Sequence, residues 1–180
     1  MHVIEFTCTL CQAPLRHESE AYVCARDQPS YPVTLGIPDS RIFPDRLVRS
    51  ETEQALTARL TAEYPHCSFA ELVEYFASLV PARPSNIVEK HRVHFQSGVV
   101  RAKSSLAEIQ RLGALSVRGQ FLEIGYGTGG FLVAAADVFR TVVGLDTSLP
   151  RLMLAKKQLE ETGRQAIVIS ACAEFSSVFS

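Results

Sequence analysis

A run of four glycines, with an acidic residue on either side of it, is the pattern in this chain that most directly predicts chemistry. From residue 121 the sequence reads FLEIGYGTGGFLVAAADVFRTVVGLD, with Glu123 just before the glycines and Asp146 at the end. A glycine turn after a strand lets the backbone approach a ligand closely, and the next helix presents unpaired N–H groups there. A carboxylate at the end of the following strand can accept both hydroxyls of a ribose. The pattern therefore predicts a site for a cofactor that contains adenosine.

The same glycines fit two kinds of cofactor. Gly125, Gly127 and Gly130 satisfy the G-x-G-x-x-G fingerprint of dinucleotide-binding proteins, which place a pyrophosphate at the helix N-terminus. Glu123 would repel that anion, but it would attract the sulfonium and the α-amino group of S-adenosylmethionine. The loop also lies far from the start of the chain, behind a region with helical patterning. Both features favour S-adenosylmethionine.

Two segments resemble the first two motifs of class I S-adenosylmethionine-dependent methyltransferases. FLEIGYGTGGFL resembles the acidic-x-Gly-x-Gly-x-Gly motif, VVGLDTSLPRLMLAKK resembles the second, and the resemblance covers residues 105–175. It implies a Rossmann-like methyltransferase sheet. It also implies that Gly125, Gly127 and Gly129 wrap the methionine part of the cofactor, with Glu123 near its amino group.

The resemblance also assigns the adenosine end of the cofactor. Asp146 would hold the ribose hydroxyls, and Leu145 and Thr147 would lie beside the adenine. Many members of the family follow the third strand with an Asp-Ala-Glu-like turn whose Asp reaches the adenine amine, whereas this chain has Cys172 there. The contact still expected from this turn is one from the backbone of Ala173.

Three of the five cysteines lie near the start of the chain with the spacing of metal ligands. Cys8, Cys11 and Cys24 form a C-x2-C-x12-C pattern, and Asp27 occupies the position of a fourth ligand. Zinc prefers four ligands, mostly thiolate and imidazole, so His17 is an alternative to Asp27. We expect a structural zinc ion that holds together a module too small to fold on its own core. The alternative is a ribbon that has lost its metal.

The same segment resembles the small zinc ribbon at the N-terminus of some bacterial methyltransferases. In those proteins the second knuckle is Cys-x2-Cys, followed by Tyr-Pro-Val and Gly-Ile-Pro. Here the tail YPVTLGIP matches, and Asp27 replaces the last cysteine.

Two Ser-x-x-Glu capping boxes predict the starts of helices in the middle of the chain. Ser50 with Glu53, and Ser68 with Glu71, each precede an apolar series with the helical period. A third helical stretch is predicted over residues 87–113, with a break or bend near Gly98.

The last third of the chain alternates apolar strands with amphipathic helices in the order strand–helix–strand–helix–strand, which predicts a parallel sheet and an α/β fold. We therefore divide the chain into a zinc-ribbon-like module over 1–45, a helical cap or linker region over 46–113, and the N-terminal half of a Rossmann-like methyltransferase domain over 114–180. No fourth strand follows the third in the sequence. Because the first strand would then be an unpaired edge, we expect a missing C-terminal half or a partner protein to cover it.

Composition excludes several classes of protein. The formal net charge is −1, no apolar run reaches the ~20 residues that span a bilayer, and the N-terminus does not read as a signal peptide. These features predict a cytoplasmic protein that does not enter a membrane. Between residues 89 and 118, six Lys and Arg residues stand against two Glu, which indicates either a solvated helix face or a surface for RNA.

Together the patterns predict an S-adenosylmethionine-dependent methyltransferase with a small molecule as methyl acceptor. An rRNA methyltransferase and a non-catalytic module that binds S-adenosylmethionine are the alternatives. The hypothesis of a dehydrogenase is supported by the shared glycine fingerprint alone. The sequence identifies no catalytic base, since methyl transfer depends mainly on aligning the reactants.

Overall fold

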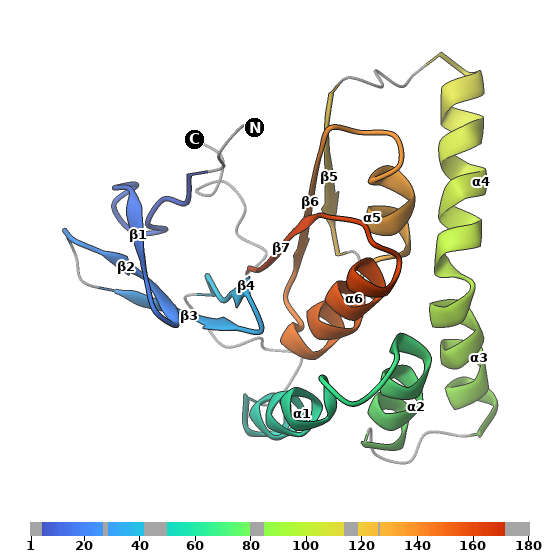
Figure 1. The fold of residues 1–180 in the computed structure, drawn as a ribbon, viewed down its shortest axis with the longest axis horizontal. Helices are drawn as coiled ribbons and strands as arrows, with labels where there is room; N and C mark the ends of the chain where they lie inside the picture. Colours follow the sequence, from blue (N-terminus) through green and yellow to red (C-terminus); the bar gives the residue numbers. More distant parts are fainter. Residues whose placement is uncertain are drawn as a thin grey trace.

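The computed structural model of the chain describes residues 5–26, 29–41, 50–79, 85–113, 119–125 and 127–171. An antiparallel sheet comes first, with the strands β1 (Leu15–Glu18), β2 (Ala21–Cys24), β3 (Ser30–Thr34) and β4 (Ile37–Pro38). Helices follow, namely α1 (Ser50–Glu63), α2 (Phe69–Leu79), α3 (Ser85–Gln96) and α4 (Gly98–Arg111). The last part alternates β5 (Gln120–Ile124), α5 (Gly130–Ala135), β6 (Thr141–Asp146), α6 (Leu149–Glu161) and β7 (Ile167–Ser170). Figure 1 shows this succession of parts.

Strands β5, β6 and β7 form a parallel sheet in that order, so the predicted strand–helix–strand–helix–strand sequence of elements is confirmed. Helices α5 and α6 cover one face, where Val168 of β7 packs in the main core with Leu132 and Leu152. Leu145 and Ile169 belong to a second apolar cluster. Successive side chains of a strand point to opposite faces, so the continuous apolar runs of β6 and β7 reflect burial on both sides.

The two edges of the parallel sheet differ. Beside β7, Asp39 forms a parallel bridge with Ser170, and the Ser40 N–H donates to the Ser170 carbonyl at 2.8 Å. The antiparallel sheet is thus hydrogen-bonded to the parallel one, which the sequence did not predict. On the other side, β5 is the edge strand within the described part of the chain, and Leu122 and Ile124 are 43% and 54% exposed.

One of the two predicted capping boxes is formed as expected. The Ser68 N–H donates to the Glu71 carboxylate at 2.8 Å, and the Glu71 N–H donates to the Ser68 hydroxyl at 3.3 Å. The other box pairs Glu53 with Ser50, at which α1 begins as expected, but the side chain of Ser50 lies outside the described part, so that capping contact stays a prediction. The buried carboxylate of Glu53 accepts from the Arg41 guanidinium and from the Leu149 N–H. Among the described helices, none has the length and apolar character to cross a membrane.

The predicted break in the third helical stretch lies at Ser97, between α3 and α4. Next to it, the backbones of Gly98 and Gly130 touch, since a Cβ on Gly130 would lie 2.5 Å from the Gly98 carbonyl carbon. This contact brings the start of α4 against the start of α5, so Gly130 serves the packing of two helices rather than a ligand alone.

We expect Gly130→Ala to destabilise the protein by about 1–3 kcal/mol, because the added methyl group overlaps the backbone of α4. The matched control is Gly98→Ala, whose Cβ would lie 3.5 Å from Gly130 Cα, an ordinary contact, and should be tolerated. Urea unfolding of the two variants measures the difference. Equal stability of both would contradict this description of the contact.

Candidate functional site

The glycine loop connects β5 to α5 through left-handed backbone conformations. Gly125, Gly127 and Gly129 have φ angles of 74°, 59° and 79°, a region that residues with a Cβ rarely adopt. Gly129 also lies against α6, since a Cβ on it would be 2.7 Å from the Cβ of Ala155. A Cβ on Gly125 or Gly127 would meet no described atom within 4 Å. These two glycines therefore serve the turn itself and leave open space beside it.

Asp146 ties the end of β6 to this loop. The side chain is buried, and its Oδ2 accepts the Gly127 N–H at 3.0 Å while its Oδ1 accepts the Ser148 N–H at 2.9 Å. Each carboxylate oxygen can accept a further hydrogen bond, so both remain able to bind ligand hydroxyls. The carboxylate that the sequence assigned to the ribose is thus held beside the glycine turn.

Glu123 contributes a carboxylate beside the glycine turn. Within the described residues, its Oε2 atom is buried and takes part in no hydrogen bond. Burial, and then the negative charge of Asp146, raise the pKa of Glu123 to about 7. A buried acceptor without a donor is unfavourable, so this oxygen is suited to a cation or an N–H group that a ligand brings.

A cleft of about 740 Å³ opens beside the loop, with walls from two distant parts of the chain. Glu123, Gly127 and Thr128 line it from the loop side, and His94 and Arg101 line it from α3 and α4. Arg101 donates to Nδ1 of His94 at 2.7 Å and to the His94 carbonyl at 2.8 Å. A carboxylate on one wall and a guanidinium on the other suit a zwitterionic group such as an α-amino acid.

The structure brings three of the predicted metal ligands together. The Sγ atoms of Cys8, Cys11 and Cys24 all lie within 4.8 Å of one another, and Cys11 and Cys24 are 3.5 Å apart. His17 is not part of this group, and its ring packs against Tyr22 with centroids 4.7 Å apart. Asp27 lies outside the described residues.

The Cys8 thiol is held in a polar setting. Burial acts to raise its pKa, but hydrogen bonds from the Tyr31 hydroxyl, from backbone groups and from Cys24 lower the pKa to about 7. The Tyr31 oxygen lies 3.3 Å from the Cys8 sulfur. A thiol that ionises near neutral pH is a good zinc ligand, because zinc binds the thiolate. Three thiols at this spacing therefore fit zinc.

Other predicted residues lie apart from these groups or outside the described part. Thr147 follows Asp146, and its carbonyl accepts from Arg41. Ala173 and Cys172 fall in the stretch 172–180, beyond the described residues, so the backbone contact to adenine stays a prediction. Sequence reasoning missed Arg41 altogether, because a single arginine far from the glycine loop belongs to no motif.

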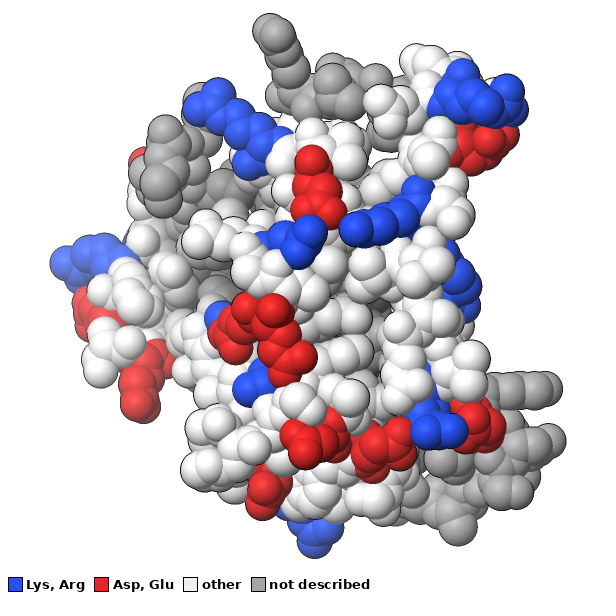
Figure 2. All heavy atoms as spheres, turned by 45° about the vertical axis from the view of Figure 1, so that its right-hand side comes forward, with Lys and Arg blue, Asp and Glu red and all other residues white. Residues whose placement is uncertain are grey.

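The basic stretch between residues 89 and 118 carries many paired charges. Arg92 bonds Glu89 at 2.7 Å, Arg111 bonds Glu108 at 2.7 Å, and Lys103 lies 3.4 Å from Asp137. On the face drawn in Figure 2, Lys and Arg side chains are interspersed with Asp and Glu rather than gathered in one patch. Three of the six cations of this stretch therefore have acidic partners.

No protein-family model matches the sequence, and no curated protein matches it either. Solved structures that resemble parts of the chain include a candidate methyltransferase from Bacillus halodurans C-125, with 28% identity, a TM-score of 0.36, and coverage of 39% of this chain and 31% of that one. A chain from a structure that concerns the conversion of a disulfide bond into a thioacetal group during echinomycin biosynthesis shares 24% identity at a TM-score of 0.33, with coverage of 38% and 27%. An S-adenosylmethionine-dependent methyltransferase from Clostridium acetobutylicum ATCC 824 shares 17% identity at a TM-score of 0.36, with coverage of 46% and 36%. The matched part spans between 27% and 36% of the length of these solved chains.

Proposed function

We propose that this chain binds S-adenosylmethionine and forms the cofactor-binding part of a methyltransferase that acts on a small molecule. The observation that carries the proposal is the buried Oε2 of Glu123, which has no donor among the described residues and lies beside the glycine turn with the buried Asp146. Two carboxylates at one loop disfavour a pyrophosphate and favour a ligand with cationic groups and ribose hydroxyls. This chemistry separates S-adenosylmethionine from the dinucleotides of a dehydrogenase.

The residues of the site would bind and orient the cofactor. Glu123 would accept the α-ammonium group, Arg101 faces the cleft with a charge that suits the α-carboxylate, and Asp146 would accept the ribose hydroxyls. When bound, S-adenosylmethionine supplies a methyl group that its sulfonium activates for transfer. Positioning the methyl group and excluding water contribute most to such a reaction, and the cleft beside the loop serves both.

The ion pairs along α3 and α4 weigh against RNA as the methyl acceptor. A surface for phosphates needs cations that are free to replace counterions, whereas Arg92, Lys103 and Arg111 have acidic neighbours. A small molecule that enters the cleft agrees better with this distribution of charge. A module that binds the cofactor without catalysis would use the same site and is the second candidate.

We also propose that Cys8, Cys11 and Cys24 hold a structural zinc ion, with Asp27 as the fourth ligand. The proposal rests on the mutual distances of the three sulfur atoms and on the small size of the antiparallel sheet, whose own apolar cluster is small. The role of the ion would be to stabilise the module rather than to react.

Lowering the pH from 8 to 6 should weaken the binding of S-adenosylhomocysteine about tenfold, because Glu123, with a pKa of about 7, must be ionised to accept an ammonium group. Isothermal titration calorimetry across this range measures the effect. Glu123→Gln should bind S-adenosylhomocysteine weakly at every pH, and its affinity should not change with pH. A wild-type affinity that does not change with pH would contradict the role given to Glu123.

Ionisation of Glu123, which should strengthen ligand binding as the pH rises, should lower the stability of the ligand-free protein. Since its pKa is higher in the folded state than the ordinary value of 4.5, the folded state loses stability as the pH rises from 4.5 to about 7. We therefore expect Glu123→Gln to be more stable than the wild type at pH 8, by ~1 kcal/mol after allowance for solvent screening of the carboxylate. Urea unfolding at pH 5 and pH 8 checks the sign.

A further inference from the structure

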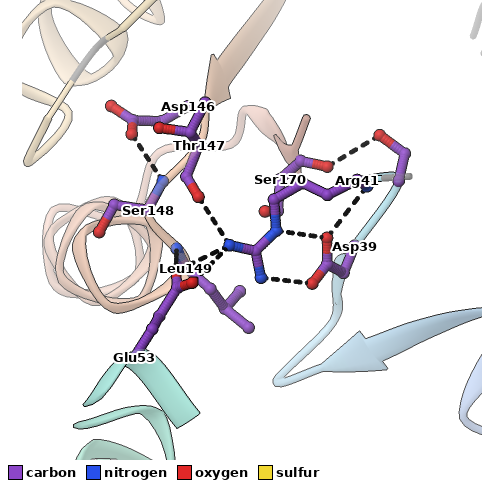
Figure 3. Close-up of polar contacts among 9 residues, drawn as sticks. Asp39, Arg41, Glu53, Asp146, Thr147, Ser148, Leu149 and Ser170 are labelled. Atoms are coloured by element: carbon purple, nitrogen blue, oxygen red, sulfur yellow. Dashed lines mark hydrogen bonds and ion pairs between the residues drawn. The ribbon is translucent and has the colours of Figure 1, made fainter. Parts of the chain in front are cut away.

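We propose that Arg41 is a positioning residue of the cofactor site, which holds the loop after β6 and through it the carboxylate of Asp146. The inference rests on the proposed function for the identity of the ligand. Arg41 itself has no expected contact with the cofactor. Figure 3 shows its guanidinium between the segment that follows β4, the helix α1 and the start of α6.

Arg41 is held by two carboxylates from different parts of the chain. Its Nε and Nη2 atoms donate to the two oxygens of Asp39 at 2.8 and 2.6 Å. Its Nη1 atom donates to both oxygens of Glu53 at 2.8 and 2.7 Å. The side chain is 13% exposed, so these bonds form in a setting largely shielded from water. Shielding strengthens each contact and fixes the position of the guanidinium.

The same guanidinium reaches the loop that carries Asp146. Its Nη1 atom also donates to the carbonyl of Thr147 at 2.8 Å, and Oε1 of Glu53 accepts the Leu149 N–H at 3.0 Å. Between them, the Ser148 N–H donates to Asp146. Three successive residues after Asp146 therefore each have a backbone group bonded to this network or to Asp146 itself.

The network also connects the site with the antiparallel sheet. Asp39, which holds Arg41, pairs with Ser170 at the end of β7, and Ser170 is the strand partner of Asp146. The hydroxyl and the N–H of Ser40 both donate to the Ser170 carbonyl at 2.8 Å. The carboxyl ends of β6 and β7 are thus fixed from the side opposite the glycine loop.

The geometry needs arginine rather than any cation. One planar group serves three acceptors that come from three elements, and a lysine ammonium could satisfy them only by giving up the bidentate contact with Asp39. Arg41→Lys keeps the charge and loses the planar fork, so it separates geometry from charge. Arg164→Lys is the matched control, because Arg164 forms a similar fork with Asp137, at 2.8 and 3.2 Å, and neither residue lines the cofactor cleft.

The first measurement is amide hydrogen exchange of residues 147–149 in the ligand-free protein. We expect exchange about tenfold faster in Arg41→Lys than in wild type, and no change at these residues in Arg164→Lys. Should Arg41→Lys not fold, Asp39→Asn loosens the same fork and is expected to give a smaller change in the same direction. Wild-type exchange at these residues in a folded Arg41 variant would overturn the proposal.

The second measurement is the affinity for S-adenosylhomocysteine and for its 2′-deoxy analogue. If Arg41 acts through Asp146 on the ribose, Arg41→Lys should lower the affinity for S-adenosylhomocysteine about tenfold. The affinity for the 2′-deoxy analogue should fall much less. An equal loss for both ligands, or a loss no larger than in Arg164→Lys, would overturn the proposal. Failure of the wild type to bind S-adenosylhomocysteine would refute the proposed function instead, and the exchange measurement would still decide whether Arg41 holds the loop.

Discussion

Asp146→Ala is expected to reduce the affinity for S-adenosylhomocysteine by at least a factor of about 100. The substitution removes the acceptor proposed for two ribose hydroxyls, and each hydrogen bond to a charged group contributes about 1.5–3 kcal/mol. It also frees the N–H groups of Gly127 and Ser148, which the carboxylate holds in place. The loss therefore combines missing contacts with a looser loop. Isothermal titration calorimetry measures the affinity.

The control for this variant is Asp137→Ala. Asp137 also accepts from a charged partner, Arg164, but it is exposed, whereas Asp146 is buried and bonded to the glycine loop. Its loss should leave the affinity for S-adenosylhomocysteine within about twofold of wild type, since exposed ion pairs contribute little. Equal affinities of Asp146→Ala and wild type would contradict the location of the ribose site.

Cys24→Ser is expected to release the proposed zinc ion and to unfold the part of the antiparallel sheet that carries the cysteines, around β1 and β2. Structural zinc contributes on the order of 10 kcal/mol to the folding of small zinc-finger peptides, and this module buries few apolar side chains of its own. Metal analysis should find one zinc per wild-type chain purified without chelator, and much less in the variant. Hydrogen exchange over residues 5–26 should then approach that of an unfolded segment.

Cys67→Ser is the control for the loss of a thiol. Cys67 packs beside the main core and is not part of the group of three sulfur atoms. The Cys67→Ser variant should keep its zinc, and the hydrogen exchange of residues 5–26 should match that of the wild type. Less than a tenth of an equivalent of zinc in the wild-type protein would refute the metal site.

Local sequence patterns were enough to predict the parallel part of the fold. The apolar runs of β5, β6 and β7 and the glycines between β5 and α5 all act over a few residues. The break near Gly98 was predicted for the same reason. Its cause, the contact with Gly130, joins residues far apart in the sequence and became visible in the structure.

The Arg41 network shows why the rest could not be predicted. Glu53 has the right spacing for a capping box with Ser50, and nothing near it in the sequence indicates that it faces Arg41 and the start of α6. Its contact with Leu149 joins residues 96 positions apart, and that of Arg41 with Thr147 joins residues 106 positions apart. Such contacts depend on how the elements pack, which intrinsic propensity and periodicity do not encode.

The candidate site also has a part that the sequence predicts and a part that became known from the structure. Glu123, the glycines and Asp146 could be named from the sequence, because each follows or ends a strand in a fixed order. Among the described residues, Oε2 of Glu123 is left without a donor, and α3 and α4 supply His94 and Arg101 to the cleft. Both features depend on how the helices pack on the loop. The sequence therefore predicts the residues of the candidate site more readily than it predicts what surrounds them.

Calorimetric titration of the wild-type protein with S-adenosylhomocysteine and, separately, with NADH at pH 8 tests the central claim most directly. The two carboxylates of Glu123 and Asp146 at the glycine turn predict binding of S-adenosylhomocysteine and no measurable binding of NADH. Binding of NADH without binding of S-adenosylhomocysteine, or binding of neither, would contradict it.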